Sequence, residues 1–478
     1  MIELRTAVWL MLGAIHVAVV IRAVLLQGRE PYARASWLIV LLAAPGAGTA
    51  LYLLFGEPWI SPRVRVRWTK AAEALAPYAR PDAIRPVVVR QASENAFRTC
   101  EAASGWPTSG GNLARLAPGS DEAIDMIAAD IDAAVRTVHL SFYIWLGDRN
   151  GSTIVEAVCR AAARGVTCRV VADALGSRAL IRSPQWAAMR KAGAILCESL
   201  PIPFGLGFVV GRRADLRNHR KIVVVDGRLT WCGSQNCADA AFLPKRRFAP
   251  WVDILLRLEG PVARQAEVIF CSAWMAETGE DMTRVFDAEP VRAPTGGFAA
   301  ISVGTGPLSP RATMSDVFVS VLAAARESAV VTTPYFAPDP PLLEALVATA
   351  RRGVRVTIVF PRRNDSWMAG AISRAYYPAL AGAGVDIHEF EGGLLHAKTL
   401  VVDDALVLLG SANMDRRSLD LNYENNVLLE SAEVAHAVGR QQQRWLGQSV
   451  RLAPNEVAIR PLPQRFVDNL LTMAAPLF

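Results

Sequence analysis

Two stretches of the sequence repeat the same set of polar residues at the same spacing. Residues 219–236 read HRKIVVVDGRLTWCGSQN, and residues 396–413 read HAKTLVVDDALVLLGSAN. In each copy a lysine follows the histidine by two positions, an aspartate follows it by seven, and a Gly-Ser-x-Asn ends the stretch. A lone His-x-Lys is weak evidence, but two copies with intact internal spacing favour a catalytic site over an ordinary core strand.

These residue types suit chemistry on a phosphodiester. In an extended strand each histidine and its lysine share one face. Lysines and asparagines would neutralise the non-bridging oxygens, one histidine would attack phosphorus to give a phosphohistidine, and the other would protonate the leaving oxygen. The candidate catalytic residues are His219, Lys221, Asp226, His396, Lys398 and Asp403, and the candidate phosphate-binding residues are Ser234, Asn236, Ser411 and Asn413.

Three carboxylates near the motif invite separate interpretations. Asp226 falls at an Asp-Gly turn that closes its strand, so a local role in fixing the hairpin is an alternative to catalysis. Asp253 lies 34 residues after His219, and Glu424 lies 28 residues after His396. We expect each of the last two carboxylates to fix the tautomer of a histidine. No cluster has metal-ligand spacing, and we predict neither a metal nor a cofactor.

The elements around the motif also occur twice. Each half reads as strand, helix, strand and then hairpin, with EAVCRAAARG in the first half matching EALVATARRG in the second. Gly165 and Gly353 stand where a helix C-terminal glycine is expected. The alternation predicts an α/β fold of two duplicated lobes with pseudo-twofold symmetry, in which His219 and His396 meet in one shared site.

Two apolar runs near the N-terminus, Ala7–Leu26 and Leu38–Phe55, are long enough to cross a membrane. Pro45-Gly46 predicts a kink in the second run. A cleaved signal peptide is the alternative, but the first run is long for one and a second run follows directly. We therefore predict a two-helix transmembrane hairpin.

Charge and domain order complete the outline. Four basic residues after the hairpin place the rest of the chain in the cytoplasm by the positive-inside rule, namely Arg63, Arg65, Arg67 and Lys70. The net charge of +7 suits an anionic partner, and the seven cysteines, without paired spacing, are expected to be reduced. The predicted domains are a hairpin at 1–60, a linker at 61–111, a first lobe at 112–292 and a second lobe at 293–478.

The duplicated His-x-Lys-x4-Asp with Gly-Ser-x-Asn resembles the phospholipase D superfamily. Together with REPYARASWLIVLLAAPGAGTALYLLFG, FYIWLGDRNGSTIVEAV and GGLLHAKTLVVDD, it is similar to the bacterial cardiolipin synthases over nearly the whole chain. The resemblance implies a phosphatidyltransferase of the inner membrane that makes cardiolipin and glycerol from two phosphatidylglycerols. It also implies His219 as nucleophile and His396 as acid and base, an assignment that the near-symmetry of the motif leaves open to exchange.

Several alternatives remain open from the sequence. A phospholipase D hydrolase or transphosphatidylase that uses phosphatidylethanolamine or another alcohol is the second functional class. The apolar N-terminus argues against a nuclease, so we expect lipid and membrane but no nucleic acid as partners. The apolar stretch Leu200–Arg213 is either a buried loop or a segment that enters the bilayer, and the sequence does not give the oligomeric state.

Overall fold

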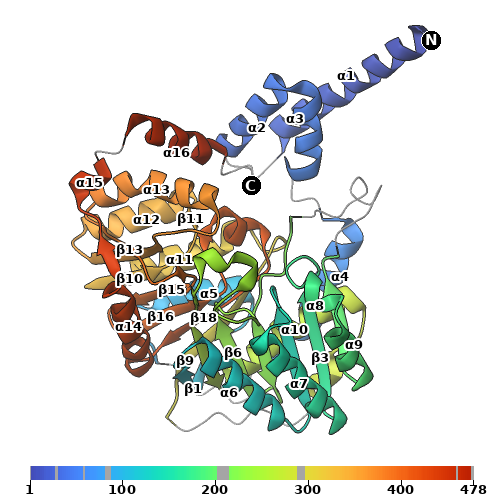
Figure 1. The fold of residues 1–478 in the computed structure, drawn as a ribbon, viewed down its shortest axis with the longest axis vertical. Helices are drawn as coiled ribbons and strands as arrows, with labels where there is room; N and C mark the ends of the chain where they lie inside the picture. Colours follow the sequence, from blue (N-terminus) through green and yellow to red (C-terminus); the bar gives the residue numbers. More distant parts are fainter. Residues whose placement is uncertain are drawn as a thin grey trace.

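The computed structural model describes residues 2–26, 31–56, 60–80, 88–201, 215–287, 296–458 and 461–474 (Figure 1). A single fifteen-stranded sheet runs through the body of the protein, with helices on both of its faces. The alternation of strands and helices predicted from the sequence is confirmed as a mixed α/β fold. The stretch Leu200–Arg213 lies almost entirely outside the described residues, so both interpretations of it stay open.

The strands of the first half follow one another across the sheet from its outer edge to the centre. Their order is β4 (Ile195–Ser199), β3 (Thr167–Asp173), β2 (Thr137–Phe142), β5 (Ile222–Val225), β6 (Leu229–Gly233), β8 (Leu255–Glu259) and β1 (Ser109–Leu116). The β2–β3 and β3–β4 pairs are parallel, and the others are antiparallel. The parallel strand β3 and the antiparallel strand β5 are buried along almost their whole length, which explains their continuous apolar runs.

The second half repeats this strand order inward from the opposite edge. It runs through β13 (Asp386–Phe390), β12 (Arg355–Pro361), β10 (Ser328–Thr332), β15 (Thr399–Val402), β16 (Leu406–Gly410), β18 (Glu424–Glu430) and β9 (Phe298–Thr305), with β19 (Ser449–Arg451) added outside β13. The halves join where β1 pairs antiparallel with β9, in a register that is interrupted between Ser109 and Asn112. Both motif strands, β5 and β15, therefore lie near the middle of their own half.

Helices pack on the sheet where the repeat predicts them. The helix α7 (Arg149–Ala163) begins at Asp148, whose side chain accepts a hydrogen bond from the Gly151 amide, and ends before Gly165 at φ +88°. Its counterpart α12 (Pro340–Arg351) is capped in the same way by Asp339 and ends before Gly353 at φ +94°. Positive φ costs glycine little, which explains both helix ends.

The other helices of the two halves pack on the sheet or on one another. They are α6 (Ser120–Asp132), α8 (Arg178–Ile181), α9 (Pro184–Lys191), α10 (Pro261–Thr278), α11 (Thr313–Ala323), α13 (Trp367–Gly382), α14 (Ala432–Leu446), α15 (Pro454–Ala458) and α16 (Leu462–Ala474). Of these, α15 and α16 lie against α13. The segment 61–111, predicted as a linker, differs from that expectation because it carries α4 (Pro62–Leu75) and α5 (Glu94–Ser104). The first of these packs on α10 and the second on β9, so this segment belongs to the packed body.

The N-terminal region extends away from the body as helices (Figure 1). Among the described residues, Glu3–Leu25 of α1 (Ile2–Leu25) is the one stretch long and apolar enough to cross a membrane. The second apolar run divides into α2 (Pro31–Ala43) and α3 (Pro45–Leu51), which separate at Ala44 as the proline predicts. Val19 and Ala23 of α1 share a buried cluster with Trp37, Leu41 and Tyr52, which lie in this second run or directly before it.

Candidate active site

Each motif histidine is held by backbone hydrogen bonds to the opposite half of the chain. The His219 amide donates to the Tyr423 carbonyl at 2.9 Å, and the Tyr423 amide donates to the Arg217 carbonyl at 3.0 Å. In the other half, β14 (Leu394–Leu395) pairs in parallel with β7 (Trp251–Val252), and the His396 amide donates to the Val252 carbonyl at 2.8 Å. Each histidine therefore enters the site on a segment whose backbone is hydrogen-bonded to the opposite half.

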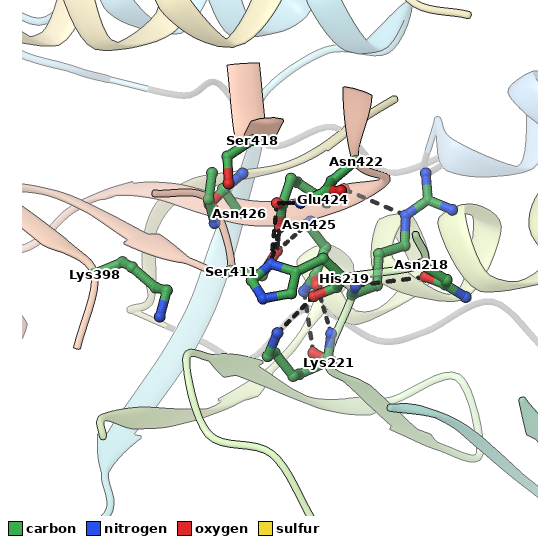
Figure 2. A network of polar contacts seen from close by, with 12 residues as sticks. Asn218, His219, Lys221, Lys398, Ser411, Ser418, Asn422, Glu424, Asn425 and Asn426 are labelled. Carbon is green, nitrogen blue, oxygen red and sulfur yellow. Dashed lines mark hydrogen bonds and ion pairs between the residues drawn. The ribbon is translucent and has the colours of Figure 1, made fainter. Parts of the chain in front are cut away.

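The carboxylates predicted to orient the histidines are paired across the same boundary. Nδ1 of His219 lies 3.0 and 2.9 Å from the two carboxylate oxygens of Glu424 (Figure 2). Nδ1 of His396 lies 2.6 Å from Oδ1 of Asp253. The sequence spacing relates each carboxylate to the histidine of its own half. In the structure each carboxylate instead contacts the histidine of the other half.

The two motif serines are bound to these carboxylates. The Ser234 hydroxyl donates to Asp253 at 2.6 Å and accepts from the Ile254 amide at 3.1 Å, and the Ser411 hydroxyl donates to Glu424. Both serines are fully buried, and neither lines the pocket described below. This arrangement argues against the expectation that Ser234 and Ser411 bind the substrate phosphate, because their hydroxyls already donate to the carboxylates.

Asp226 and Asp403 lie at the far ends of the motif strands. The Asp226 carboxylate accepts from three successive backbone amides, those of residues 135–137, at 2.8 to 3.0 Å. Asp403 accepts from the amides of residues 326–328 at 2.8 to 2.9 Å. Both residues have positive φ, of +53° and +49°. These contacts favour the local role that the turn suggested for Asp226 over a place in the candidate catalytic set, which stays a prediction.

The motif lysines lie beside the histidines and are almost fully buried. Lys221 donates from Nζ to the His219 carbonyl at 2.7 Å, and Lys398 donates to the His396 carbonyl at 2.6 Å. An ammonium group has three donors, so each lysine keeps donors beyond this backbone contact. Figure 2 shows both lysines beside the His219 network.

A pocket of about 330 Å³ contains both histidines and both motif asparagines. Oδ1 of Asn236 accepts from the Ile144 amide at 3.1 Å, and Oδ1 of Asn413 is buried without a hydrogen-bond partner among the described residues. Sequence reasoning missed most of the other polar residues that line this pocket, namely Tyr143, Arg217, Lys245, Tyr335, Asp365, Asp415, Arg417 and Asn422.

Arg217 is the missed residue that the sequence itself could have indicated. It stands two positions before His219, and strand alternation places the two side chains on one face. Its Nη1 pairs with Oδ1 of the buried Asp173 at 3.3 Å, while its Nε and Nη2 have no hydrogen-bond partner among the described residues. These free donors belong to a side chain that lines the pocket, as an anion-binding group would.

Burial shifts the titration of the basic groups. It lowers the pKa of His219 to about 4 although Glu424 opposes the change, and it lowers the pKa of His396 with Lys398 acting in the same direction. Burial also lowers the pKa of Lys221 to about 7 and that of Lys398 to about 8. At neutral pH both imidazoles are therefore uncharged.

The carboxylates shift in the direction that keeps them ionised. Burial raises the pKa of Asp253, but His396, Lys398 and Ser234 outweigh it and bring the pKa to about 2. The pKa of Glu424 is lowered by His219, Lys221 and Ser411 against the same effect of burial. A neutral imidazole facing a carboxylate holds its proton on Nδ1, so Nε2 keeps a lone pair for a reaction.

Two protein-family models match the sequence of this chain. The family described as "Cardiolipin synthase, PLD-like domain" matches residues 127–274 and 318–445, which contain both motif copies. A second family, described as "Phospholipase_D-nuclease N-terminal", matches residues 14–57.

Curated relatives match almost the whole chain. The chain is 33% identical to "Cardiolipin synthase A" of Edwardsiella ictaluri (strain 93-146) and of Klebsiella pneumoniae (strain 342), over 98% of this chain and 96% of each relative. Among solved structures, the phosphatidylserine synthase of Haemophilus influenzae Rd KW20 aligns with a TM-score of 0.57 at 16% identity. That alignment covers 79% of this chain and 99% of the other, and it supports the fold alone.

Proposed function

The chain belongs to the cardiolipin synthases of the phospholipase D superfamily, and from that premise we propose how its site makes cardiolipin. It acts as a phosphatidyltransferase that moves a phosphatidyl group from one phosphatidylglycerol to the glycerol hydroxyl of another, and it releases glycerol. The observation that carries this proposal is the pair of imidazoles in one pocket, each held through Nδ1 by a carboxylate.

In the first step His219 is the nucleophile. Its neutral Nε2 attacks phosphorus, the bond from phosphorus to the glycerol oxygen breaks, and His396 gives a proton to that oxygen as it leaves. The charge of the bound phosphodiester raises the pKa of a neighbouring imidazole, so His396 is protonated in the complex although it is neutral in the empty pocket. The product is a phosphohistidine with the diacylglycerol moiety still attached through phosphate.

In the second step His396 reverses its role. It takes the proton from a hydroxyl of the second phosphatidylglycerol, the resulting alkoxide attacks phosphorus, and the N–P bond to His219 breaks. His396 therefore gives up one proton and recovers one over the whole cycle, while His219 keeps the proton on its Nδ1. In-line displacement requires groups on both sides of phosphorus, and the two halves of the chain supply one histidine each.

The charge that develops on phosphorus is stabilised by polar groups of the pocket wall and by the two motif lysines beside the histidines. Lys221 and Lys398 keep free donors next to the histidines, and Asn236, Asn413 and Arg217 lie at the pocket wall. Preorganised donors in a buried site stabilise such charge more strongly than water does. We therefore assign the non-bridging oxygens to the lysines, the asparagines and Arg217.

The chain is membrane-associated through its N-terminus, and we further propose a multi-pass arrangement. The packing of α2 and α3 on α1 supports a two-helix hairpin, and the basic residues of α4 support a cytoplasmic location for the two lobes. Matching strand orders in the halves support a pseudo-twofold axis between β1 and β9 and a limit between the two lobes near residue 292. Reporter fusions after residues 28 and 60 test the orientation.

Membranes that contain the protein, supplied with phosphatidylglycerol labelled in its terminal glycerol, test the reaction. The expected products are cardiolipin and free glycerol, in equal amounts. Phosphatidate with free glycerol and no cardiolipin would instead identify a hydrolase. Adding phosphatidylethanolamine to the same assay shows whether it competes as the second lipid, and His219→Ala is the inactive control.

A further inference from the structure

A second pocket, of about 430 Å³, lies behind the segment that carries His219. It shares no lining residue with the catalytic pocket. Its walls come from α4, α10 and the ends of α5 and β9, and they are largely apolar, with Trp68, Ala72, Trp106, Val268, Ile269 and Leu308 among them. The volume falls within the range of about 300 to 1,000 Å³ that is usual for small-molecule sites.

A buried cation stands in the wall of this pocket. Arg220 is only 6% exposed, and burial lowers its pKa to about 10, so it remains charged at neutral pH. Its guanidinium lies 5.1 Å from the ring centre of Tyr423 and 5.7 Å from that of Trp68. It forms no ion pair with a carboxylate among the described residues, although a buried charge without a counterion is strongly unfavourable.

Two polar atoms of this wall lack hydrogen-bond partners in the described part of the chain. Arg220 donates from Nε to the Glu424 carbonyl at 3.3 Å and from Nη2 to the Thr305 carbonyl at 3.2 Å, which leaves Nη1 without a partner. The hydroxyl of Thr305, itself 4% exposed, is also buried without a partner. Buried polar groups are almost always satisfied, so the pair indicates an acceptor with negative charge.

We propose that this pocket binds a single-chain anionic amphiphile, with its acid group on Arg220 and Thr305 and its hydrocarbon chain along α4 and α10. An inorganic anion would leave the apolar walls unfilled, and a neutral lipid would leave the guanidinium unpaired. Because α4 follows the apolar N-terminal helices, the pocket lies on the part of the body that is tethered to them. The acid group is either a carboxylate, as in a fatty acid, or a phosphate, as in a lysophosphatidate.

Glu73 offers the competing explanation, since its exposed side chain on α4 lines the same pocket. If this carboxylate were the counterion of Arg220, no ligand would be needed. The two explanations differ in the parent protein, because an internal counterion would exclude the amphiphile as long as Glu73 is present. On our proposal the parent binds the amphiphile and Glu73→Gln binds it equally or more tightly, whereas binding that appears only in Glu73→Gln would overturn the proposal.

Native mass spectrometry of the full-length protein in an uncharged detergent measures the binding. Titrations with oleate and with 1-oleoyl lysophosphatidate distinguish the two acid groups, and oleyl alcohol and inorganic phosphate are the controls for chain and charge. We expect one molecule of at least one acidic lipid per chain and no saturable binding of either control. Equal binding of oleyl alcohol, or the absence of any saturable binding, would overturn the proposal.

Variants locate the site. Arg220→Gln should weaken binding at least tenfold, and because a buried substitution risks misfolding, Ala72→Phe fills the pocket from the exposed surface of α4 as a second route to the same loss. Ala74→Phe, on the same helix but outside the pocket, is the matched control and should bind like the parent. Repeating the titration in His219→Ala without phosphatidylglycerol separates failure of this proposal from failure of the proposed catalysis.

Discussion

Glu424 of the second half holds His219 of the first half, with 2.9 Å between its Oε2 and Nδ1. The reverse pairing also occurs, because Oδ1 of Asp253 in the first half lies 2.6 Å from Nδ1 of His396 in the second half. Neither half therefore contains a complete histidine–carboxylate pair, and the site exists only when both halves share the sheet through β1 and β9.

Neutralising the orienting carboxylates should remove most of the activity. Glu424→Gln and Asp253→Asn are each expected to lower kcat by roughly 10²- to 10⁴-fold, because an amide no longer enforces the Nδ1-protonated tautomer. Turnover of phosphatidylglycerol in steady state measures this. Since Glu424 acts through His219, the double variant with His219→Ala should be no slower than His219→Ala alone, and an additive loss would contradict the pairing.

Much of this arrangement follows from the sequence because the chain is duplicated. The common spacing in residues 219–236 and 396–413 is enough to single out both histidines, both lysines and both asparagines as candidates. The crossed pairing did not follow, because spacing within one half carries no information about which half a side chain faces. The hydrogen bond from Ser234 to Asp253 does not follow from the spacing either, because it depends on the pairing of the neighbouring strands β6 and β8.

The polar residues outside the motif were the least predictable part. Tyr143 and Tyr335 reach the catalytic pocket from loops after β2 and β10, where no periodic pattern marks them. Arg217 is the exception, because its position two residues before His219 would place both side chains on the same face of an extended strand. The helices α4 and α5 were missed because the Arg-, Pro- and Ala-rich composition of 61–111 resembles a connector, although Ala71, Leu75 and Phe97 are buried.

The pH dependence of the free enzyme should differ from that of the enzyme–lipid complex. His219 must be neutral, so kcat/KM falls below about pH 4. His396 must be protonated and its pKa is lowered, while Lys221 and Lys398 lose their charge near pH 7 and 8. Hence the alkaline decline of kcat/KM should begin at a pH below the usual pKa of histidine.

The bound phosphodiester raises the pKa of all these cations, so the alkaline limb of kcat should lie at higher pH than that of kcat/KM. Both profiles, measured from about pH 4 to about pH 9, test this because they report the complex and the free enzyme separately. Asp253→Asn removes the anion that favours protonated His396 and should move both alkaline limbs to lower pH. Superimposable profiles would show that the substrate charge has no such effect.

Removing the Asp226 carboxylate should affect stability and not chemistry. Asp226→Ala deprives three backbone amides of their acceptor and places alanine at φ +53°, so we expect the free energy of unfolding to fall by about 2 kcal/mol. Asp226→Asn keeps one acceptor oxygen and tolerates positive φ, so it should lose less. Denaturant unfolding gives the stability, and kcat per folded molecule should stay within about twofold, whereas a large loss of kcat would restore Asp226 to the catalytic set.

Arg217 should contribute to binding of the lipid phosphate. Arg217→Lys keeps a positive charge near Asp173 but loses the planar fork whose Nε and Nη2 are unpartnered in the described residues. We expect KM for phosphatidylglycerol to rise by roughly tenfold, equivalent to about 1.4 kcal/mol, with a smaller change in kcat. Arg228→Lys, at a surface ion pair with Glu259, is the matched control and should leave both constants unchanged. An unaltered KM in Arg217→Lys would exclude this contact.

The assignment of nucleophile and acid can be decided by trapping the intermediate. In His396→Ala the second phosphatidylglycerol finds no base, so the phosphatidyl group should accumulate on His219 while one equivalent of glycerol is released. That variant also lacks the acid for the first step, which slows formation of the intermediate. A phosphatidyl ester of p-nitrophenol removes this difficulty, because p-nitrophenolate leaves without a proton. We expect a stoichiometric burst of p-nitrophenol in His396→Ala, none in His219→Ala, and an acid-labile adduct that peptide mapping places on His219. An adduct on His396 in the His219→Ala variant would exchange the two roles. The geometry permits either histidine to attack, because each is hydrogen-bonded through Nδ1 to a carboxylate.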